Sequence, residues 1–419
     1  MGLPEYINAL KEAIKVIEKH EQVVIAHHND ADGLSSAAIV IEALKRRGVK
    51  ALNVPLERVH PLIIKRLLEK FSDLIMFVDL GAGAAPEISK INAGRRKIII
   101  IDHHHTPGVD DPSIMNLSTE LYGISGDREI SASGAAYIFA ITMDSRNRDL
   151  AYLGVVGAIG DSHHRFGKLE SVNRQILFDA VGLKQVVVEE LDGREKYYLT
   201  VFDDKIDLDK FAKSLTVLGA VGYLMGGPDI GIETLINGPT TRYKETLERL
   251  NKLKREKFSK VIEKLKTEGL NKSKYLQWLH VHDFFYPMGV KVIGEFCMEI
   301  RNDPEIVDPN MYLAGFQDMP REVPRLGEFD WNIVKVSFRL PSKLEERVLK
   351  GEMPGYNYLV PRAAAHVGGD IDACHGYACA TTFEKGLEEE FAKYFDYYVE
   401  EYIKEQKKAL AQIPMHAGK

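Results

Sequence analysis

The sequence predicts an α/β protein in which a parallel sheet with covering helices is joined by a long helix to a smaller α/β domain. Short segments that are almost entirely apolar, at 23–26, 74–78 and 97–101, alternate with helical patterns in the first 165 residues. Strands of this kind are typical of parallel sheets buried on both faces. A long helical pattern follows at 240–265, and strand patterns return from residue 275.

The first half of the chain alternates helix and strand signals. Residues 5–19 carry apolar side chains at helical spacing, and a short buried strand is predicted next at 23–26. Ser35 is expected to cap a helix that runs to Arg47 and ends at Gly48. Further helices are predicted over 61–71, 131–143 and 149–160, and a strand over 51–55. Residues 180–240 contain glycine clusters and give no clear assignment.

The second half begins with the long helix, whose exposed face is rich in Lys and Arg. This basic face could line a nucleic-acid groove or be simply solvated. Strands are predicted at 278–281, 289–293 and 334–340, and a final helix at 386–409. The predicted domains are therefore 1–239, with the candidate metal motifs in 20–165, a connector helix at 240–270, and 271–419.

Bulk properties limit the class of protein. A chain of 419 residues is too long for one core, so two domains are expected. The net charge of −6 excludes binding of duplex DNA through overall charge alone. Cys297, Cys374 and Cys379 predict no disulfide framework and no zinc spacing. With no apolar segment of membrane length and no signal-peptide pattern, we expect a soluble cytoplasmic protein that does not bind membranes.

Acidic residues follow several predicted strands. The carboxyl ends of parallel strands share one edge of a sheet, so these residues are expected to lie close together. Asp30, Asp79 and Asp102 each come just after an apolar strand, and Asp161 follows a glycine-rich helix. Histidines lie close to Asp30 and Asp102 in the sequence. Crowded carboxylates and neutral imidazoles are unfavourable unless a cation holds them together. The pattern therefore predicts a pair of divalent metal ions.

The motifs differ in strength. Asp30 and Asp32 alternate after a strand, so each could hold one of two adjacent ions, although an Asp-capped turn is the competing interpretation. The run from Asp102 to His105 follows a buried strand and has no packing reason, which leaves a solvated polar loop as its alternative. Asp79 and Asp161 would each be weak signals alone, because an Asp after a strand often caps a helix.

Four segments, 27–39, 77–83, 98–105 and 147–161, resemble in order and spacing the motifs of the DHH phosphoesterase superfamily, in particular its archaeal RecJ-like branch. The resemblance implies two Mn²⁺ ions, with Mg²⁺ or Co²⁺ as possible substitutes. It implies the metal ligands His28, Asp30, Asp32, Asp79, His103 and Asp161, with Asp79 bridging the ions. Asp102 and His104 would be catalytic residues around these ligands, orienting an imidazole or contacting the scissile phosphate. His27 is expected to point away, and the role of His105 stays open.

The second domain resembles the DHHA1 substrate-binding domain in part. The segment 336–339 is similar to the strand whose arginine meets phosphate, and 363–369 is similar to the approach to a glycine-rich loop. Asp370 occupies the usual histidine position of that loop, and the nearest histidine is displaced along the chain. The resemblance implies that substrate is bound by Ser337, Arg339, Gly368, Gly369 and His375. An edge-strand surface charge and a plain turn are the alternatives for Arg339 and the glycine pair.

The predicted function is a two-metal phosphodiesterase that hydrolyses single-stranded DNA or RNA, or short oligonucleotides, in the manner of an exonuclease. Hydrolysis of small nucleotides, such as nucleotide bisphosphates or cyclic dinucleotides, is the alternative that the altered glycine loop suggests. A replication-associated scaffold would have degenerate ligand positions, whereas every matched ligand position here holds His or Asp. Expected partners are a single-stranded nucleic acid or oligonucleotide, with replication or repair proteins and a second copy of the chain as further candidates.

Overall fold

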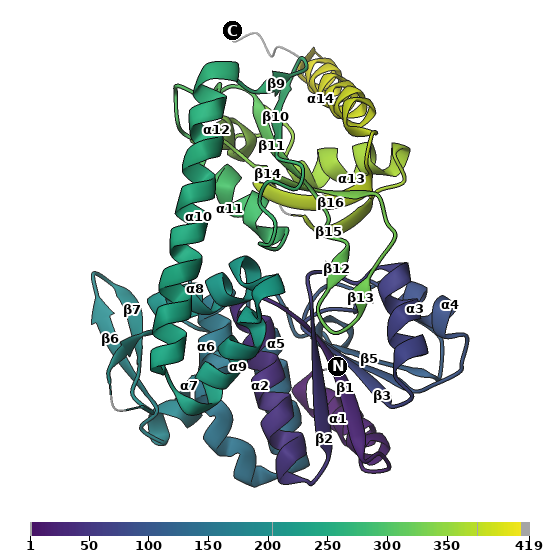
Figure 1. The fold of residues 1–419 in the computed structure, drawn as a ribbon, viewed down its shortest axis with the longest axis vertical. Coiled ribbons are helices and arrows are strands. Elements are labelled where there is room, and N and C mark those ends of the chain that lie inside the picture. Colours follow the sequence, from purple (N-terminus) through teal and green to yellow (C-terminus); the bar gives the residue numbers. More distant parts are fainter. Residues whose placement is uncertain (1, 203, 375, 412–419) are drawn as a thin grey trace, which may run out of the picture. The chain divides into compact units, whose positions relative to one another are not determined.

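The computed structural model describes residues 2–411 apart from Asp203 and His375, and it divides into two compact units (Figure 1). The N-terminal unit comprises Met1–Asn251 together with Glu322–Phe329, and the C-terminal unit comprises Lys252–Arg321 and Asp330–Lys419. The division falls inside the long helix α10 (Thr241–Glu268). The basic residues of this helix are partly engaged within the C-terminal unit, where Lys254 Nζ lies 2.9 Å from Glu295 Oε2.

The N-terminal unit is built on a five-stranded parallel sheet in the order β2-β1-β3-β4-β5. Its strands are β1 (Gln22–His28), β2 (Lys50–Leu56), β3 (Leu74–Val78), β4 (Ile98–Asp102) and β5 (Ile114–Ser118). Every residue of β3 and β4 is buried, as a sheet covered on both faces requires. The edge strand β5 was not predicted, because polar residues interrupt its apolar pattern.

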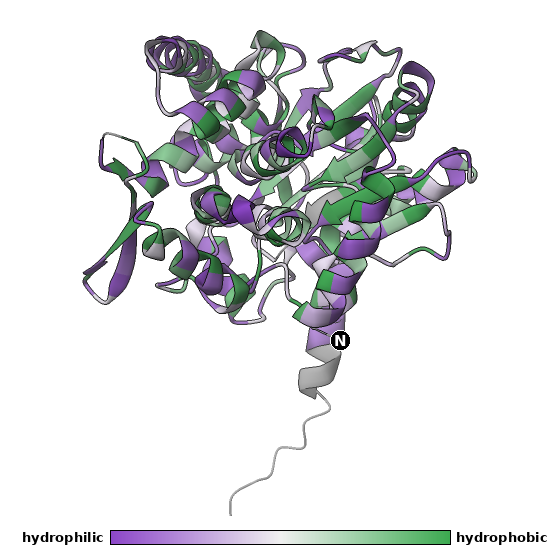
Figure 2. Cartoon of the chain, turned by 90° about the horizontal axis from the view of Figure 1, so that it is seen from below, coloured by the Kyte–Doolittle hydropathy of each residue, from purple (hydrophilic) through white to green (hydrophobic). Residues whose placement is uncertain are grey.

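Helices cover both faces of this sheet (Figure 1). On one face, α2 (Ala31–Arg46), α5 (Ala132–Met143) and α6 (Ala151–Gly160) pack against one another. On the other face lie α3 (Pro61–Lys70) and α4 (Ala85–Asn92), while α1 (Leu3–Ile17) packs against α5. The sheet strands are hydrophobic and the outer helix faces hydrophilic (Figure 2), which confirms the predicted layering.

Residues 171–240, most of which the sequence left unassigned, add smaller elements to this unit. They are α7 (Ser171–Gly182), the antiparallel strands β6 (Val186–Leu191), β7 (Arg194–Leu199) and β8 (Ile206–Asp207), α8 (Leu208–Thr216) and α9 (Gly227–Asn237). One of its glycines supports the loop after β1, because a Cβ on Gly219 would meet the carbonyl oxygen of Asn29 at 1.5 Å. The Asn29 amide also donates to the Gly219 carbonyl at 3.2 Å.

A short hairpin of β12 (Glu322–Val323) and β13 (Gly327–Glu328) belongs to the N-terminal unit although its flanking strands belong to the other unit. Arg66 of α3 donates to the carbonyls of Leu326 (2.9 Å) and Glu328 (3.2 Å) and covers the Phe329 ring at 4.7 Å. Arg325 donates to Asp229 Oδ1 at 2.8 Å and to the backbone of Asn53 in β2. The hairpin is therefore held by side chains from several elements of the N-terminal unit.

The C-terminal unit contains a mixed sheet in the order β15-β16-β14-β11-β10-β9, in which β10 and β11 are parallel and the other neighbours antiparallel. The strands are β9 (Asn271–Lys272), β10 (Leu276–His280), β11 (Tyr312–Asp318), β14 (Ile333–Arg339), β15 (Asp370–Cys374) and β16 (Ala378–Glu384). Helices α13 (Tyr356–His366) and α14 (Glu388–Ala411) cover one aromatic-rich core, which includes Phe338, Phe391 and Phe395. The unit is completed by α12 (Ser342–Leu349).

Two expectations for this unit are wrong. The predicted strand at 289–293 is instead the start of α11 (Lys291–Ile300), because Val292, Ile293 and Phe296 bury one helical face. Cys374 and Cys379 form a disulfide across the β15–β16 hairpin, whereas no disulfide was expected. The short spacing gave no framework signal, since the pairing depends on the two strands lying side by side.

Among the described residues, no helix combines the length and apolarity needed to cross a bilayer.

Candidate metal centre

The candidate metal residues of the N-terminal unit gather where its parallel strands end. His28 is the last residue of β1, Asp79 follows β3, and Asp102 ends β4. These three strands are neighbours in the sheet. Because the chain order reverses between β1 and β3, this is also the switch point at which open α/β sheets bind ligands.

The two carboxylates after β1 point to different surroundings. Asp30 caps α2, since its Oδ1 accepts from the Gly33 amide at 3.0 Å, and its Oδ2 lies 3.2 Å from His28 Nδ1. Asp32 is buried and accepts from the amides of Ala132 (2.8 Å) and Ser133 (3.0 Å) at the start of α5. Asp30 therefore lies among the clustered donor atoms, while both oxygens of Asp32 are already bound by a helix N-terminus.

Asp79 occupies the centre of the cluster. Its Oδ2 is 3.4 Å from His28 Nδ1, and its Oδ1 is 3.6 Å from His103 Nε2. Its backbone has φ 60°, a left-handed conformation that Asp tolerates better than most residues. The Asp79 amide donates to the Ile101 carbonyl at 3.0 Å, which holds this conformation in place. One carboxylate is thus presented to two imidazoles at once.

The four residues from Asp102 to His105 have different surroundings. The carbonyl of Gly126 can only accept, so the 2.8 Å contact from His103 Nδ1 places the proton there and leaves Nε2 as a free lone pair. That Nε2 faces Asp79 and Asp161 Oδ2, the latter at 3.8 Å. Asp102 is buried and lies 2.7 Å from His104 Nδ1. His105 is exposed.

Asp161 completes the cluster together with a residue that the sequence interpretation missed. Asp161 caps the C-terminus of α6, and the buried His163 places Nε2 3.0 Å from its Oδ2. His103, Asp161 and His163 together form one of the groups that could hold an ion, and His28, Asp30 and Asp79 form another. The signal was present in the sequence, since two histidines follow Asp161 within three residues.

The electrostatics of the cluster favour a cation. Burial, followed by the charges of Asp32 and Asp30, raises the pKa of Asp79 well above its usual range. Burial alone would also raise the pKa of Asp102, but the charge and hydrogen bond of His104 and the donor amide of Ala82 lower it below the usual range. Burial lowers the pKa of His104, yet the charge and hydrogen bond of Asp102 outweigh it and raise the pKa to about 10. Carboxylate oxygens and neutral imidazole suit Mn²⁺, so the donor set fits this metal.

The candidate substrate residues lie in the C-terminal unit and do not form one cluster. Ser337 and Arg339 are on β14, and Arg339 pairs with Ala378 of β16. Gly368 and Gly369 precede β15, whose first residue pairs with Thr382, four positions further along β16. At about 3.3 Å per residue, the glycine pair and Arg339 are therefore roughly 13 Å apart along the strand direction. His375 lies outside the described residues.

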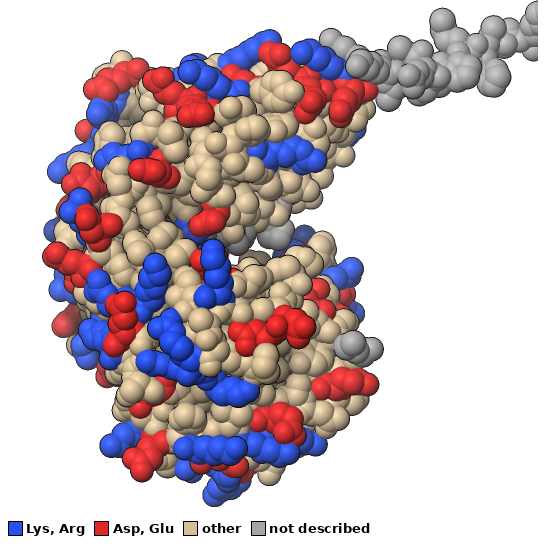
Figure 3. Space-filling model, turned by 90° about the vertical axis from the view of Figure 1, so that its right-hand side faces the viewer, with Lys and Arg blue, Asp and Glu red and all other residues tan. Residues whose placement is uncertain are grey.

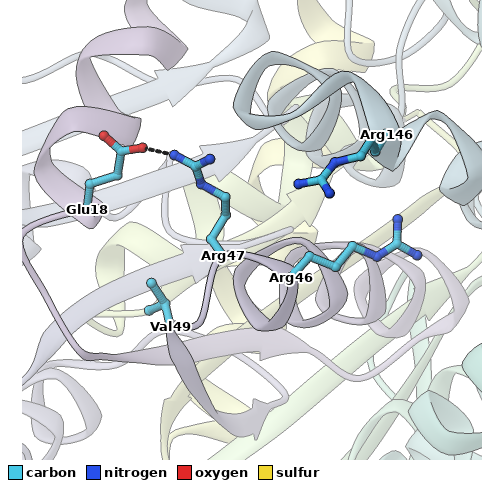
Figure 4. A pocket seen from close by; sticks show the side chains of 5 residues that line it. All are labelled: Glu18, Arg46, Arg47, Val49 and Arg146. Atoms are coloured by element: carbon cyan, nitrogen blue, oxygen red, sulfur yellow. Dashed lines mark hydrogen bonds and ion pairs between the residues drawn. The ribbon is translucent and has the colours of Figure 1, made fainter.

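A hollow of about 520 Å³ lies at the other end of the N-terminal sheet (Figure 4). Three arginines line it, and each is bound to a carboxylate: Arg46 to Asp149 at 2.6 Å, Arg146 to Asp144 at 2.6 Å, and Arg47 to Glu18. The positive charges around this hollow are therefore neutralised by carboxylates. The candidate metal site is the cluster at the strand ends.

Comparison with known proteins gives an independent view of the chain. Residues 22–157 match the profile described as "DHH family, N-terminal domain". An uncharacterized protein of Methanocaldococcus jannaschii is 30% identical over 203 residues, which cover 47% of this chain and 42% of that protein. The single-stranded-DNA-specific exonuclease RecJ of Haemophilus influenzae is 25% identical over 158 residues, 36% of this chain and 27% of that protein. The matches thus cover less than half of each relative.

Solved structures resemble the whole fold. RecJ in complex with Mn²⁺ from Thermus thermophilus has a TM-score of 0.59 at 16% identity, covering 96% of this chain and 55% of that one. A manganese-bound exonuclease RecJ gives 0.54 at 16% identity, covering 99% and 95%. CDC45 from Entamoeba histolytica gives 0.53 at 9% identity, covering 94% and 99%. With its motif residues gathered at the strand ends, the segment 22–157 forms a DHH-family domain, and the chain has a RecJ-like fold.

Proposed function

We propose that the protein is a two-metal phosphodiesterase that hydrolyses single-stranded DNA or RNA, or short oligonucleotides, and depends on Mn²⁺. The observation that carries this proposal is the position of Asp79, whose two oxygens face His28 and His103 at 3.4 and 3.6 Å. A carboxylate that bridges two ions needs this arrangement. Asp30 and Asp161 supply the outer donors of the two groups.

The residues around the cluster have separable roles in this proposal. His28, Asp30, Asp32, Asp79, His103 and Asp161 would hold the ions, and the amides of Ala132 and Ser133 at the start of α5 would orient Asp32. Two divalent ions bound there would lower the pKa of a water molecule and neutralise charge on the phosphoryl oxygens. Gly126 keeps His103 in the tautomer that offers Nε2.

His104 is the residue best placed to contact the scissile phosphate. Its side chain is 47% exposed, while its partner Asp102 is almost fully buried. In the metal-free protein, the charge and hydrogen bond of Asp102 raise the pKa of His104 to about 10, which favours its protonated, positively charged form. It can therefore bind a phosphoryl oxygen and donate a proton as the phosphodiester bond breaks, while Asp102 holds it in position.

Substrate class is proposed from the relatives and from the surface. RecJ of Haemophilus influenzae is described as specific for single-stranded DNA. The net charge of −6 does not favour binding of duplex DNA through overall charge, and in Figure 3 acidic side chains lie among the basic ones on the drawn face. Ser337 and Arg339, and separately Gly368, Gly369 and His375, are proposed to contact phosphates of the bound chain.

The test is digestion of single-stranded DNA and RNA ladders labelled at the 5′ or 3′ end, with Mn²⁺. We expect a ladder that shortens from one end, and its loss in Asp79→Asn and in His104→Ala. An Asp73→Asn variant, which changes an aspartate in the loop before β3, should retain activity. If the oligomers stay intact while a cyclic dinucleotide or nucleotide bisphosphate is cleaved, the substrate is a small nucleotide. If no phosphodiester is cleaved, the proposed function is wrong.

A further inference from the structure

His163 is buried beside the metal centre, and two roles compete for it. Its Nε2 lies close enough to the donor atoms of His103 and Asp161 to share an ion with them. The same Nε2 is also 3.0 Å from Asp161 Oδ2, within hydrogen-bond distance. A ligand must offer a lone pair at Nε2, whereas a hydrogen-bond donor must carry a proton there. The tautomer of His163 therefore decides its role.

The tautomer is fixed by a buried chain of hydrogen bonds that starts at α5. The Ser131 backbone amide donates to Asn173 Oδ1 at 3.2 Å, so the carbamoyl oxygen of Asn173 must face Ser131. The Asn173 Nδ2 then faces His163 Nδ1 at 2.9 Å. An amide nitrogen can only donate, so Nδ1 accepts and the proton of neutral His163 is on Nε2. Nε2 then donates to Asp161 Oδ2.

The buried surroundings prevent the donors and acceptors of this hydrogen-bond relay from exchanging roles. Ser131, Asn173 and His163 are 0%, 1% and 3% exposed, so water cannot replace the partners. Turning the Asn173 amide would bring its NH₂ group against the Ser131 N–H and leave two buried donors facing each other. Gly134 gives the amide its space, because a Cβ at that position would meet Asn173 Oδ1 at 2.9 Å.

We propose that His163 is a positioning residue, which donates from Nε2 to Asp161 and does not ligate metal. The relay Ser131–Asn173–His163 thereby holds Asp161 through Oδ2, the oxygen that also faces Nε2 of His103. The amides of Ala132 and Ser133, the next residues along, bind Asp32. The first turn of α5 therefore orients two carboxylates of the centre, one directly and one through the relay. This inference rests on the proposed metal centre.

The tautomer can be read directly by nitrogen-15 NMR of the full-length chain, with a His163→Gln spectrum assigning the signals. We expect a pyridine-like Nδ1 and a pyrrole-like Nε2 for His163, both without metal and with diamagnetic Mg²⁺ or Zn²⁺. A protonated Nδ1 and an unprotonated Nε2 would overturn the proposal. This measurement tests the relay even if the protein proves to bind no manganese, an outcome that would refute the proposed function instead.

Manganese affinity, measured by calorimetry, separates positioning from ligation. His163→Phe removes the donor and should weaken binding of one ion by about 10- to 100-fold, as loss of an outer hydrogen bond to a ligand typically does. His163→Gln replaces Nε2–H by an amide N–H and should stay within about threefold of the unchanged protein. The neighbouring His164→Gln, whose imidazole is paired with Asp209, is the matched control and should bind normally.

An equal loss of manganese affinity in the Gln and Phe variants would show that His163 is a ligand. Unchanged affinity in both variants would show that His163 does not position Asp161. If the Phe variant does not fold, as judged by its metal-free thermal transition, the Gln variant and the NMR tautomer still decide the matter.

Discussion

At the scale of single residues, the metal centre is a set of donors that repel one another without an ion. Asp79 shows this best, because burial and neighbouring carboxylates raise its pKa well above the ordinary range. In the metal-free protein it therefore holds a proton at pH values where a free aspartate is ionised. An incoming cation must displace that proton before the carboxylate can bind.

Manganese binding should consequently release protons and should weaken as the pH falls through the raised pKa of Asp79. Calorimetric titrations in buffers of different ionisation enthalpy measure the number of protons released. Asp79→Asn should abolish both the tight binding and the release, whereas Asp73→Asn should preserve them. A pH-independent affinity with no proton release would contradict this account.

His27 makes a second prediction, which does not involve metal. It is fully buried, its Nδ1 lies 2.7 Å from the His28 carbonyl, and its Nε2 has no hydrogen-bond partner among the described residues. Burial lowers its pKa from 6.5 to about 4. Between these values the unfolded chain binds a proton that the folded chain does not, so folding stability falls as the pH drops from about 6.5 towards 4.

The contribution of His27 should be roughly 2 kcal/mol between pH 7 and pH 5, from the pKa difference. His27→Gln cannot titrate, so its free energy of unfolding in urea should decline less over this range than that of the unchanged protein. Parallel decline of the two proteins would show that His27 is not protonated on unfolding. Sequence alternation predicted that His27 points away from the cluster, and His27 is in none of the groups of possible ligands among the described residues, but its buried Nε2 depends on packing that no local pattern specifies.

At the scale of elements, the centre depends on how closely α6 approaches α5. A Cβ on Gly157 would meet Ser133 Oγ at 2.2 Å and Asp32 Oδ1 at 2.3 Å. The glycine therefore lets the helix backbone pass beside a buried carboxylate. Glycine is unfavourable inside a helix, but any larger residue at position 157 would clash with these atoms.

Gly157→Ala should test this contact. Alanine normally stabilises a helix by about 1 kcal/mol relative to glycine, but overpacking here should instead cost about 1–3 kcal/mol. It should also weaken manganese binding, because Asp32 is displaced. Gly182→Ala near the end of α7 is the matched control, since no atom lies within 4 Å of its Cβ. Equal thermal stability of the two variants would argue against the close approach.

The hairpin β12–β13 gives another prediction at this scale. Arg66 holds it through two carbonyls and through the Phe329 ring, so Arg66→Ala should loosen it. Hydrogen exchange should then accelerate at 322–329 and in the part of α3 around residue 66. Lys65→Ala, which changes the exposed neighbour on the same helix, should leave exchange unchanged. Unaltered protection at 322–329 in the Arg66 variant would mean that other contacts suffice.

Long buried strands and their polar ends could be predicted from the sequence, because each is a continuous local pattern followed by a charged residue. The strand β5 and the helix α11 could not, for opposite reasons. Polar residues interrupt the pattern of β5, and the apolar residues at the start of α11 are too few to distinguish a strand from a helix. The roles of Asp32 and His163 depend on α5 and α7, which approach them only in the folded chain.

At the scale of the whole molecule, the ligands of the proposed two-ion centre all belong to the N-terminal unit, between residues 28 and 161, whereas a separate group of possible ligands in the C-terminal unit, His280, His282 and Asp318, is no part of that centre. Manganese should therefore stabilise that unit and leave the C-terminal unit unaffected. At a free concentration 100 times the dissociation constant, a single ion adds about 2.7 kcal/mol. Calorimetry should show one unfolding transition that shifts with manganese and a second that does not.

Asp79→Asn should abolish the shift without changing the second transition. A single transition that moves as a whole would indicate that the two units unfold together. The order of the units along the chain could be predicted from the sequence, but the assignment of 322–329 to the N-terminal unit could not, because it rests entirely on tertiary contacts.

That hairpin has a consequence for dissecting the protein. The backbone leaves the N-terminal unit at residue 251, returns for eight residues at 322, and leaves again at 329. A gene fragment ending at 251 would lack Val323, Leu326 and Phe329, all of which are buried in the intact chain. A fragment beginning at 252 would carry those apolar side chains without the surface that shields them. Neither half is then a natural unit of expression, and aggregation of the separated halves would report on this interleaving and not on any defect in the metal centre.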